Sequence, residues 1–245
     1  FDTSFWKHVG HAITNTFRAW GRSWTGGMFA PAPEAGAATG YYRQLSRYSA
    51  AFALCSDIAL LTLGGALKRK EMLSARFGDI LSELYLLSAA LKRWQDEGRK
   101  KEDFAALAWC MASGFRTIEN RFAEILANLP NRFVAAILKF LIQPFGARVV
   151  GPSDRIVQQC AQLVLEPSAA RDRLTPDLAF VDDDGPVARL EKAFRLVAAS
   201  EDIAKSMRAA RLRVWRRGQT VATAPRAAST LTLPGRPAQI DFLKA

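Results

Sequence analysis

The fold is decided by residues 71–130, which read EMLSARFGDILSELYLLSAALKRWQDEGRKKEDFAALAWCMASGFRTIENRFAEILANLP. Apolar residues recur there at alternating steps of four and three, which is the pattern of helices packed lengthwise on their neighbours. Because a short polar stretch containing Gly98 separates two such series, two long antiparallel helices are predicted. The first series is Leu73, Phe77, Ile80, Leu84, Leu87, Leu91 and Trp94. The second is Phe104, Leu107, Met111, Phe115, Ile118, Phe122, Ile125 and Leu129.

Two further helices are predicted before this pair. The nearer one begins at about Tyr41 and is apolar on two faces, which is typical of a central helix in a bundle. Gly64 and Gly65 interrupt it and predict a kink or a break, since two glycines cost a helix interior about 2 kcal/mol relative to alanine. A link rich in Ala, Pro and Gly, residues 28–40, precedes it. The first helix carries one apolar stripe of Phe5, Val9, Ile13, Phe17, Trp20 and Trp24.

Shorter elements are predicted after Pro130. Helical patterns cover residues 131–143, 153–165 and 186 to about 213, and residues 165–185 are mostly loop. The last thirty residues lose periodicity and fill with Ala, Thr, Pro and Arg, which predicts disorder. The predicted fold class is therefore all-α: a bundle of long antiparallel amphipathic helices, followed by shorter helices and a disordered tail.

The chain is strongly basic, with a formal net charge of +11 over 245 residues. This charge favours anionic partners such as nucleic acid, an acidic membrane surface or a phosphorylated ligand. No stacking aromatics are interleaved with the arginines near the C-terminus, so no specific nucleic-acid partner is predicted. The three cysteines, Cys55, Cys110 and Cys160, stand far apart and predict free thiols in a reducing compartment.

The candidate metal and acid–base residues each have a simpler structural interpretation. His8 and His11 could face one metal, but neither has a glutamate three residues before it, and surface histidines are the favoured interpretation. Asp79 and Glu83 lie one turn apart off the apolar seam, which favours a solvated charged face over acid–base work. Asp57 lies in a helix that is apolar nearly all round, so a buried ion pair is expected there in preference to a catalytic carboxylate.

Two charged runs are also ambiguous. The run Lys68-Arg69-Lys70 after the glycine pair could hold a phosphate, although a kink beside a solvated basic face is the simpler interpretation. The acidic run of residues 182–184 precedes Gly185-Pro186 and is best explained as a helix cap favoured by the helix dipole. No nucleophile elbow, Walker A loop or dinucleotide-binding glycine motif is present.

The longest apolar runs are residues 50–67 and 133–145. The first contains Asp57 and the second is shorter than the ~20 residues that a bilayer requires, so the chain is predicted not to span a membrane. The second run has basic flanks, and it could lie in a membrane interface or pack in the core. Both alternatives stay open. The surface predicted to face a membrane or a partner is Arg132, Phe133, Ile137, Lys139, Phe140, Leu141 and Arg148.

Several stretches resemble one protein family in the same order along the chain. Residues 41–99 contain LGGALKRKE and SARFGDILSELYL, and LPNRFVAAILKFLIQPFG (129–146), GPSDRI (151–156) and GPVARLEKAF (185–194) follow. These segments resemble the C-terminal extension of bacterial long-chain acyl-CoA dehydrogenases of the FadE type. FDTSFWKHVGHAITNTFRAW (1–20) resembles the helix that joins the dehydrogenase core to this extension. The resemblance covers about residues 1–205.

The resemblance implies a domain organisation and a place in a larger enzyme. Residues 1–27 would be the joining helix, 41–213 the extension domain and 214–245 the tail, which is basic where the family continues with an acidic helical end. The family's enzymes use FAD to oxidise an acyl-CoA to a trans-2-enoyl-CoA in fatty-acid β-oxidation, and pass the electrons to an electron-transferring flavoprotein. The catalytic glutamate and most of the FAD site are expected upstream of Phe1, so the chain alone is expected to be inactive and no catalytic residue is assigned.

Two functional hypotheses follow. In the first, the chain is the C-terminal part of such an enzyme and serves packing on the dehydrogenase core, subunit contact in a homo-oligomer, or membrane docking. In the second, it is a stand-alone peripheral membrane-binding helical module without enzymatic activity. The expected location is the bacterial cytoplasm, including the inner face of the cytoplasmic membrane.

Overall fold

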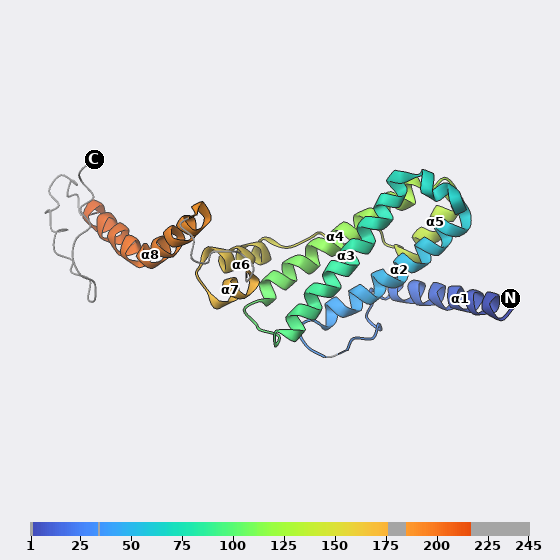
Figure 1. Ribbon diagram of the computed structural model, residues 1–245, viewed down its shortest axis with the longest axis horizontal. Coiled ribbons are helices and arrows are strands. Elements are labelled where there is room, and N and C mark those ends of the chain that lie inside the picture. Colours follow the sequence, from blue (N-terminus) through green and yellow to red (C-terminus); the bar gives the residue numbers. More distant parts are fainter. Residues whose placement is uncertain (1, 34, 176–184, 217–245) are drawn as a thin grey trace. The chain divides into compact units, whose positions relative to one another are not determined.

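The computed structural model of the protein describes residues 2–33, 35–175 and 185–216, and these residues are all-α, as predicted (Figure 1). The chain divides into two compact units, Phe1–Pro176 and Asp177–Ala245. The predicted tail from residue 217 onward and the acidic run 182–184 lie outside the described residues. The helices of the first unit are α1 (Asp2–Trp24), α2 (Thr39–Leu63), the 3₁₀ helix η1 (Gly64–Arg69), α3 (Glu71–Asp96), α4 (Phe104–Asn128), α5 (Arg132–Ile142), α6 (Asp154–Leu165) and α7 (Ala169–Leu174).

The two seamed helices predicted from residues 71–130 are α3 and α4, and they lie side by side (Figure 1). Two ion pairs show that they run antiparallel. Arg76 Nε lies 3.0 Å from Glu124 Oε2, and Arg121 Nε lies 2.9 Å from Asp79 Oδ2, so the position on α4 falls as the position on α3 rises. The seam residues of both helices, with α2 and α5, form one core whose fully buried side chains include Tyr48, Cys55, Ile80, Leu91, Met111, Ile118, Ile125 and Leu138.

The break predicted at the glycine pair is confirmed. Helix α2 ends at Leu63, and Gly64 takes a φ of +51°, a conformation that favours glycine. The chain continues as η1, whose Leu67 packs against the core, and it re-enters a regular helix at Glu71. By length and composition alone, the helical segment Thr39–Arg69 could cross a membrane, and 28% of its most apolar window is buried in the bundle. That the chain does not span a membrane stays a prediction.

Helix α1 packs on α2 and on α5. The turn after it brings Gly27 (φ +80°) so close to α2 that a Cβ there would lie 3.0 Å from the Arg43 carbonyl oxygen. Only a residue without a side chain fits this approach and this conformation together. The glycine therefore sets the angle at which α1 leaves the bundle.

The shorter helices follow the predicted bounds closely, with one addition. The segment 165–185, predicted as mostly loop, contains the short helix α7, whose N-cap Ser168 accepts a hydrogen bond from the Arg171 amide at 3.2 Å. Helix α6 packs on α4, and α7 packs on α6. In the second unit, α8 runs over Pro186–Arg216 and carries ion pairs one turn apart, such as Glu191 with Arg195 at 3.0 Å.

Candidate functional site

The most unusual surface of the first unit is the outward face of α1. The helix turns its small residues Asn15, Ala19 and Ser23 towards the bundle, where all three are buried. Its apolar stripe points the other way, with Phe17 66% exposed and Trp20 41% exposed. Small side chains allow a close approach of two helix backbones, so the bulky stripe remains outside. We call the residues Ile13, Phe17, Trp20 and Trp24 the α1 aromatic face.

The α1 aromatic face continues onto α5 and the segment behind it. The Trp24 ring centroid lies 5.2 Å from that of Phe140 and 5.5 Å from that of Phe145, both edge-on. Trp24 also donates its indole N–H to the Phe140 carbonyl at 3.1 Å, and its ring lies 6.5 Å from Trp20. Arg148 places its guanidinium 4.0 Å above the Phe145 ring. These contacts fix a rigid aromatic surface that remains half-exposed, which is typical of an interaction site.

The structure divides the predicted α5 surface between two environments. Ala135, Leu138 and Ile142 bury one face of α5 in the core, and Leu141 packs against that core as well. The remaining residues of the predicted surface are exposed: Arg132, Phe133, Ile137, Lys139, Phe140 and Arg148. Core packing, one of the two alternatives left open by the sequence, therefore holds for the inner face of α5. Contact of the exposed face with a membrane or a partner stays a prediction.

Arg132 also has a structural role that its basic character did not suggest. Its guanidinium donates to the carbonyl oxygens of Ala127 at 2.8 Å and Leu126 at 3.3 Å, which are unpaired acceptors at the end of α4. The N-cap of α5 is Asn131, whose side chain accepts from two amides of the first turn. The turn between α4 and α5 is therefore tightly defined.

A second feature, invisible in the sequence, is a buried carboxylate at the junction of α2, α4 and the segment after α5. Glu119 on α4 is 1% exposed. Its Oε1 accepts from the Tyr48 hydroxyl at 2.9 Å and pairs with Arg47 at 3.5 Å. Its Oε2 accepts from the amides of Arg148 at 2.5 Å and Val149 at 2.8 Å. We call these five residues the Glu119 junction.

Both carboxylate oxygens of Glu119 accept hydrogen bonds, which is what a buried carboxylate requires. Burial is also the main cause that raises the pKa of Tyr48. The Tyr48 phenol is thus a fixed hydrogen-bond donor rather than a base. The junction serves to tie the chain after α5, which carries Phe145 and Arg148 of the aromatic surface, back to the bundle.

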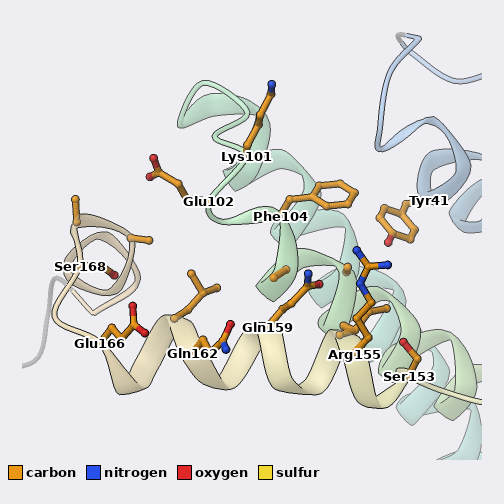
Figure 2. A pocket seen from close by; sticks show the side chains of 16 residues that line it. Tyr41, Lys101, Glu102, Phe104, Ser153, Arg155, Gln159, Gln162, Glu166 and Ser168 are labelled. Atoms are coloured by element: carbon orange, nitrogen blue, oxygen red, sulfur yellow. The ribbon is translucent and has the colours of Figure 1, made fainter. Parts of the chain in front are cut away.

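A groove with a volume of about 860 Å³ lies between the start of α4, α6 and α7 (Figure 2). Gln159 and Gln162 of α6 project into it, and Tyr41 and Phe104 stand at one end. Its lining combines two cations with two carboxylates and several alanines, and no single ligand class matches that mixture. The charged lining residues are Lys101, Glu102, Arg155 and Glu166.

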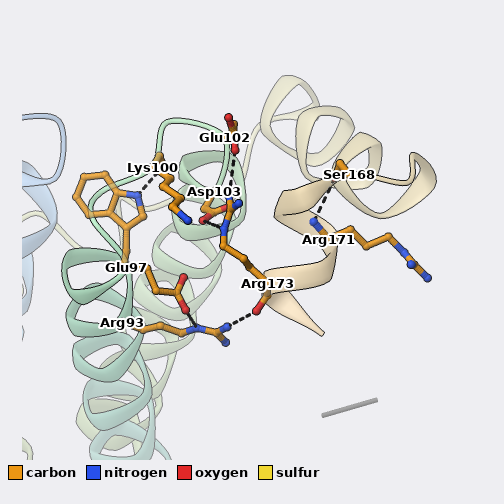
Figure 3. Close-up of polar contacts among 9 residues, drawn as sticks. Arg93, Glu97, Lys100, Glu102, Asp103, Ser168, Arg171 and Arg173 are labelled. Carbon is orange, nitrogen blue, oxygen red and sulfur yellow. Dashed lines mark hydrogen bonds and ion pairs between the residues drawn. The ribbon is translucent and has the colours of Figure 1, made fainter. Parts of the chain in front are cut away.

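Helix α7 is held at the edge of this groove by Arg173 (Figure 3). The Arg173 guanidinium lies 2.9 Å from Asp103 Oδ1 and 3.0 Å from Glu102 Oε2, both in the α3–α4 turn. The Arg173 carbonyl accepts from Arg93 at 2.7 Å, and Arg93 pairs with Glu97 at 2.8 Å. These contacts occupy the acidic residues of the turn, so they serve structure.

The remaining predicted candidates are placed separately. Asp57 is exposed, so the prediction of a buried ion pair there is wrong. The second apolar face of α2 is partly exposed to solvent near Asp57. Asp79 pairs with Arg121, which supports the charged-face interpretation. His11 is exposed, while the side chain of His8 lies outside what the structure describes.

The thiols are free in the structure and poorly suited to catalysis. Cys55 is buried, and burial raises its pKa to about 12; burial also raises the pKa of Cys110 and Cys160. Thiols of this kind react slowly, because the thiolate is the nucleophile. In the part of the chain that the structure describes, no group of three or more His, Cys, Asp or Glu residues could hold a metal ion.

Comparison with protein families shows where the chain belongs. The family described as "Acyl-CoA dehydrogenase, C-terminal, bacterial type" matches residues 1–233. No solved structure matches the chain. The matched range includes α1 and its aromatic face as well as the whole bundle, and it confirms the family resemblance of the sequence segments.

Proposed function

The chain belongs to the bacterial-type acyl-CoA dehydrogenase C-terminal family, and from this premise we propose that it is the helical C-terminal part of an FAD-dependent acyl-CoA dehydrogenase of fatty-acid β-oxidation. The complete enzyme would take an acyl-CoA to a trans-2-enoyl-CoA and deliver electrons to an electron-transferring flavoprotein. Within it, the present helices pack on the dehydrogenase core. Contact between subunits of a homo-oligomer is compatible with the same surface.

The observation that carries this proposal is the α1 aromatic face. Phe17 and Trp20 stand on the outside of a helix whose inner face already packs against the bundle, and Trp24 remains 41% exposed beside α5. Burial of apolar surface contributes about 25 cal/mol per Å², so a large rigid aromatic face provides substantial affinity for a covering protein. The sequence over this helix resembles the joining helix of the family, which supports a core next to it.

The residues described here do not fit the cofactor on their own. The groove between α4, α6 and α7 is lined by Glu102 and Glu166 and by no glycine. A dinucleotide pyrophosphate calls for a glycine-rich turn at a helix start and disfavours nearby carboxylates. We therefore propose that FAD and the acyl-CoA are held by the core, and we assign no residue of this chain to either.

A separated-chain experiment tests this function. The dehydrogenase core and this chain are expressed as two polypeptides in one cell, and the complex is purified through a tag on this chain. The core should co-purify as a yellow protein that oxidises acyl-CoA. The chain expressed alone should be colourless and inactive, and flavin absorbance in that preparation would show that the cofactor site has been misplaced.

Matched variants then locate the contact. Phe17→Ser with Trp20→Ser should abolish co-purification of the core. Tyr85→Ser with Leu86→Ser, which changes two exposed apolar residues of α3 (73% and 59% exposed), should leave it intact. Equal losses from both pairs would contradict a specific role for the α1 aromatic face.

A second candidate function rests on the exposed face of α5. Phe133 and Ile137 lie there between Arg132 and Lys139, an arrangement that suits a helix lying in a membrane interface. As a stand-alone membrane module, the chain would bind vesicles and would not retain the core. We propose a cytoplasmic location for the main function, and the inner face of the cytoplasmic membrane for the second.

A further inference from the structure

The end of the bundle at η1 exposes apolar side chains that no neighbouring helix covers. Leu61 is 86% exposed at the end of α2, and Met72 is 74% exposed at the start of α3. Leu60 is also exposed, whereas Leu63 and Leu67 turn inward and pack against the core. The exposed leucines therefore do not result from a frayed end: the same segment is anchored by its other face.

Basic residues surround these apolar side chains. Lys68, Arg69 and Lys70 are consecutive and all exposed, and the nearest acidic residues of the segment are Asp57 and Glu71. Among the described residues, none of these three cations forms an ion pair. Their charge is thus available to a partner.

The antiparallel arrangement of α3 and α4 adds the start of α5 to this end. Arg76 of the first turns of α3 pairs with Glu124 of the last turns of α4, so the α4–α5 turn lies at the same end as η1 (Figure 1). Arg132 and Phe133 begin α5 there, and Phe133 is 73% exposed. We call residues 60–72 together with Arg132 and Phe133 the η1 end.

We propose that the η1 end docks onto a bilayer that contains anionic phospholipid. Leu60, Leu61 and Met72 enter the region below the headgroups, and the cations of residues 68–70 contact lipid phosphates. Exposed leucines gain by leaving water, and each lysine or arginine near an anionic surface strengthens binding about fivefold. A protein partner would need complementary acidic groups, whereas a lipid surface satisfies both properties of this end at once. This proposal does not depend on the dehydrogenase core.

The experiment uses the full chain and vesicles of phosphatidylcholine, with and without phosphatidylglycerol. Binding should require phosphatidylglycerol and weaken with salt. The variant Lys68→Gln, Arg69→Gln, Lys70→Gln should bind at least tenfold more weakly. The matched control changes three cations at the other end of the bundle, Lys100→Gln, Lys101→Gln and Arg155→Gln, and should bind like the unchanged chain.

A depth measurement separates this end from the arginines of residues 216–236, which could also attract anionic vesicles. An environment-sensitive dye on Leu61→Cys, in a chain whose three native cysteines are replaced by alanine, should brighten and shift to shorter wavelength on binding. The same dye on Leu86→Cys should not respond. Binding without a response at position 61, equal losses from the two triple variants, or no dependence on phosphatidylglycerol would each overturn the proposal, and the last would favour a protein partner.

Discussion

The Glu119 junction and the α1 aromatic face invert the usual distribution of polar and apolar residues. One buries a carboxylate, an arginine and a phenol; the other leaves two tryptophans and a phenylalanine in contact with water. The buried charges have their partners within the chain, at 2.5–3.5 Å. The exposed aromatics have theirs, on our proposal, in another protein. A residue found in an unfavourable environment thus indicates where its partner must be.

The largest effect is expected at the Glu119 junction. Glu119→Ala should lower the free energy of unfolding by about 3–5 kcal/mol, because Arg47 and the Tyr48 hydroxyl lose their buried partner. Urea unfolding of the isolated chain measures this. Glu124→Ala removes a more exposed carboxylate that also pairs with arginine and should cost less than about 1 kcal/mol. Similar losses from the two variants would mean that the junction is not special.

The second largest effect is expected from alkaline pH, which should lower the free energy of unfolding. Burial raises the pKa of Cys55 from 9.0 to about 12, so the folded state keeps a proton that the unfolded state releases. Stability should therefore fall between about pH 9 and pH 12, at about 1.4 kcal/mol per pH unit from this group. Thermal unfolding measured across this range should show a smaller slope for Cys55→Ala, and an unchanged slope would contradict the assignment.

On the inner face of α1, adding an apolar side chain should destabilise the protein. Ala19 is fully buried against the bundle, so Ala19→Leu adds apolar volume where there is no space. We expect a loss of about 1–3 kcal/mol in the free energy of unfolding. A neutral or stabilising result would show that α1 does not pack closely on α2.

The smallest effect is expected on the outer face of the same helix. Phe17→Ser removes a large apolar side chain that is mostly exposed, so the isolated chain should change by no more than about 0.5 kcal/mol. The variant should also be more soluble. A loss as large as that of Ala19→Leu would mean that the aromatic face is buried by this chain itself, and it would remove the main support for the proposed contact with the core.

Much of the fold could be predicted from the local pattern of apolar residues, whereas the candidate site could not. The apolar seams of residues 71–130 predicted α3 and α4, because apolar residues at steps of three and four lie on one side of a helix and pack lengthwise on a neighbouring helix. Gly64 predicted the break before η1. The stripe on α1 was visible as well, but periodicity defines a face without saying which way it turns. Asp57 shows the same limit, because an apolar helix still has an outer side.

Long-range partners account for the rest. Glu119 reads as an ordinary charged residue of α4, yet it is among the most buried side chains because Tyr48 lies 71 positions away in the sequence and Arg148 lies 29 positions away. Helix α7 was missed because six residues give too little periodicity, and the contact of Arg173 with Asp103 holds it in place.

The sequence by itself determined that this protein is all-α, where its long helices begin and end, and to which family it belongs. The helices depend on neighbours three or four residues apart, and the family is visible in contiguous segments such as LGGALKRKE and SARFGDILSELYL. Only the tertiary structure decided which faces are covered. That choice depends on small residues such as Ala19 that permit close approach, and on charges such as Glu119 that must find donors from distant segments. It is this choice that leaves the α1 aromatic face and the η1 end available to partners.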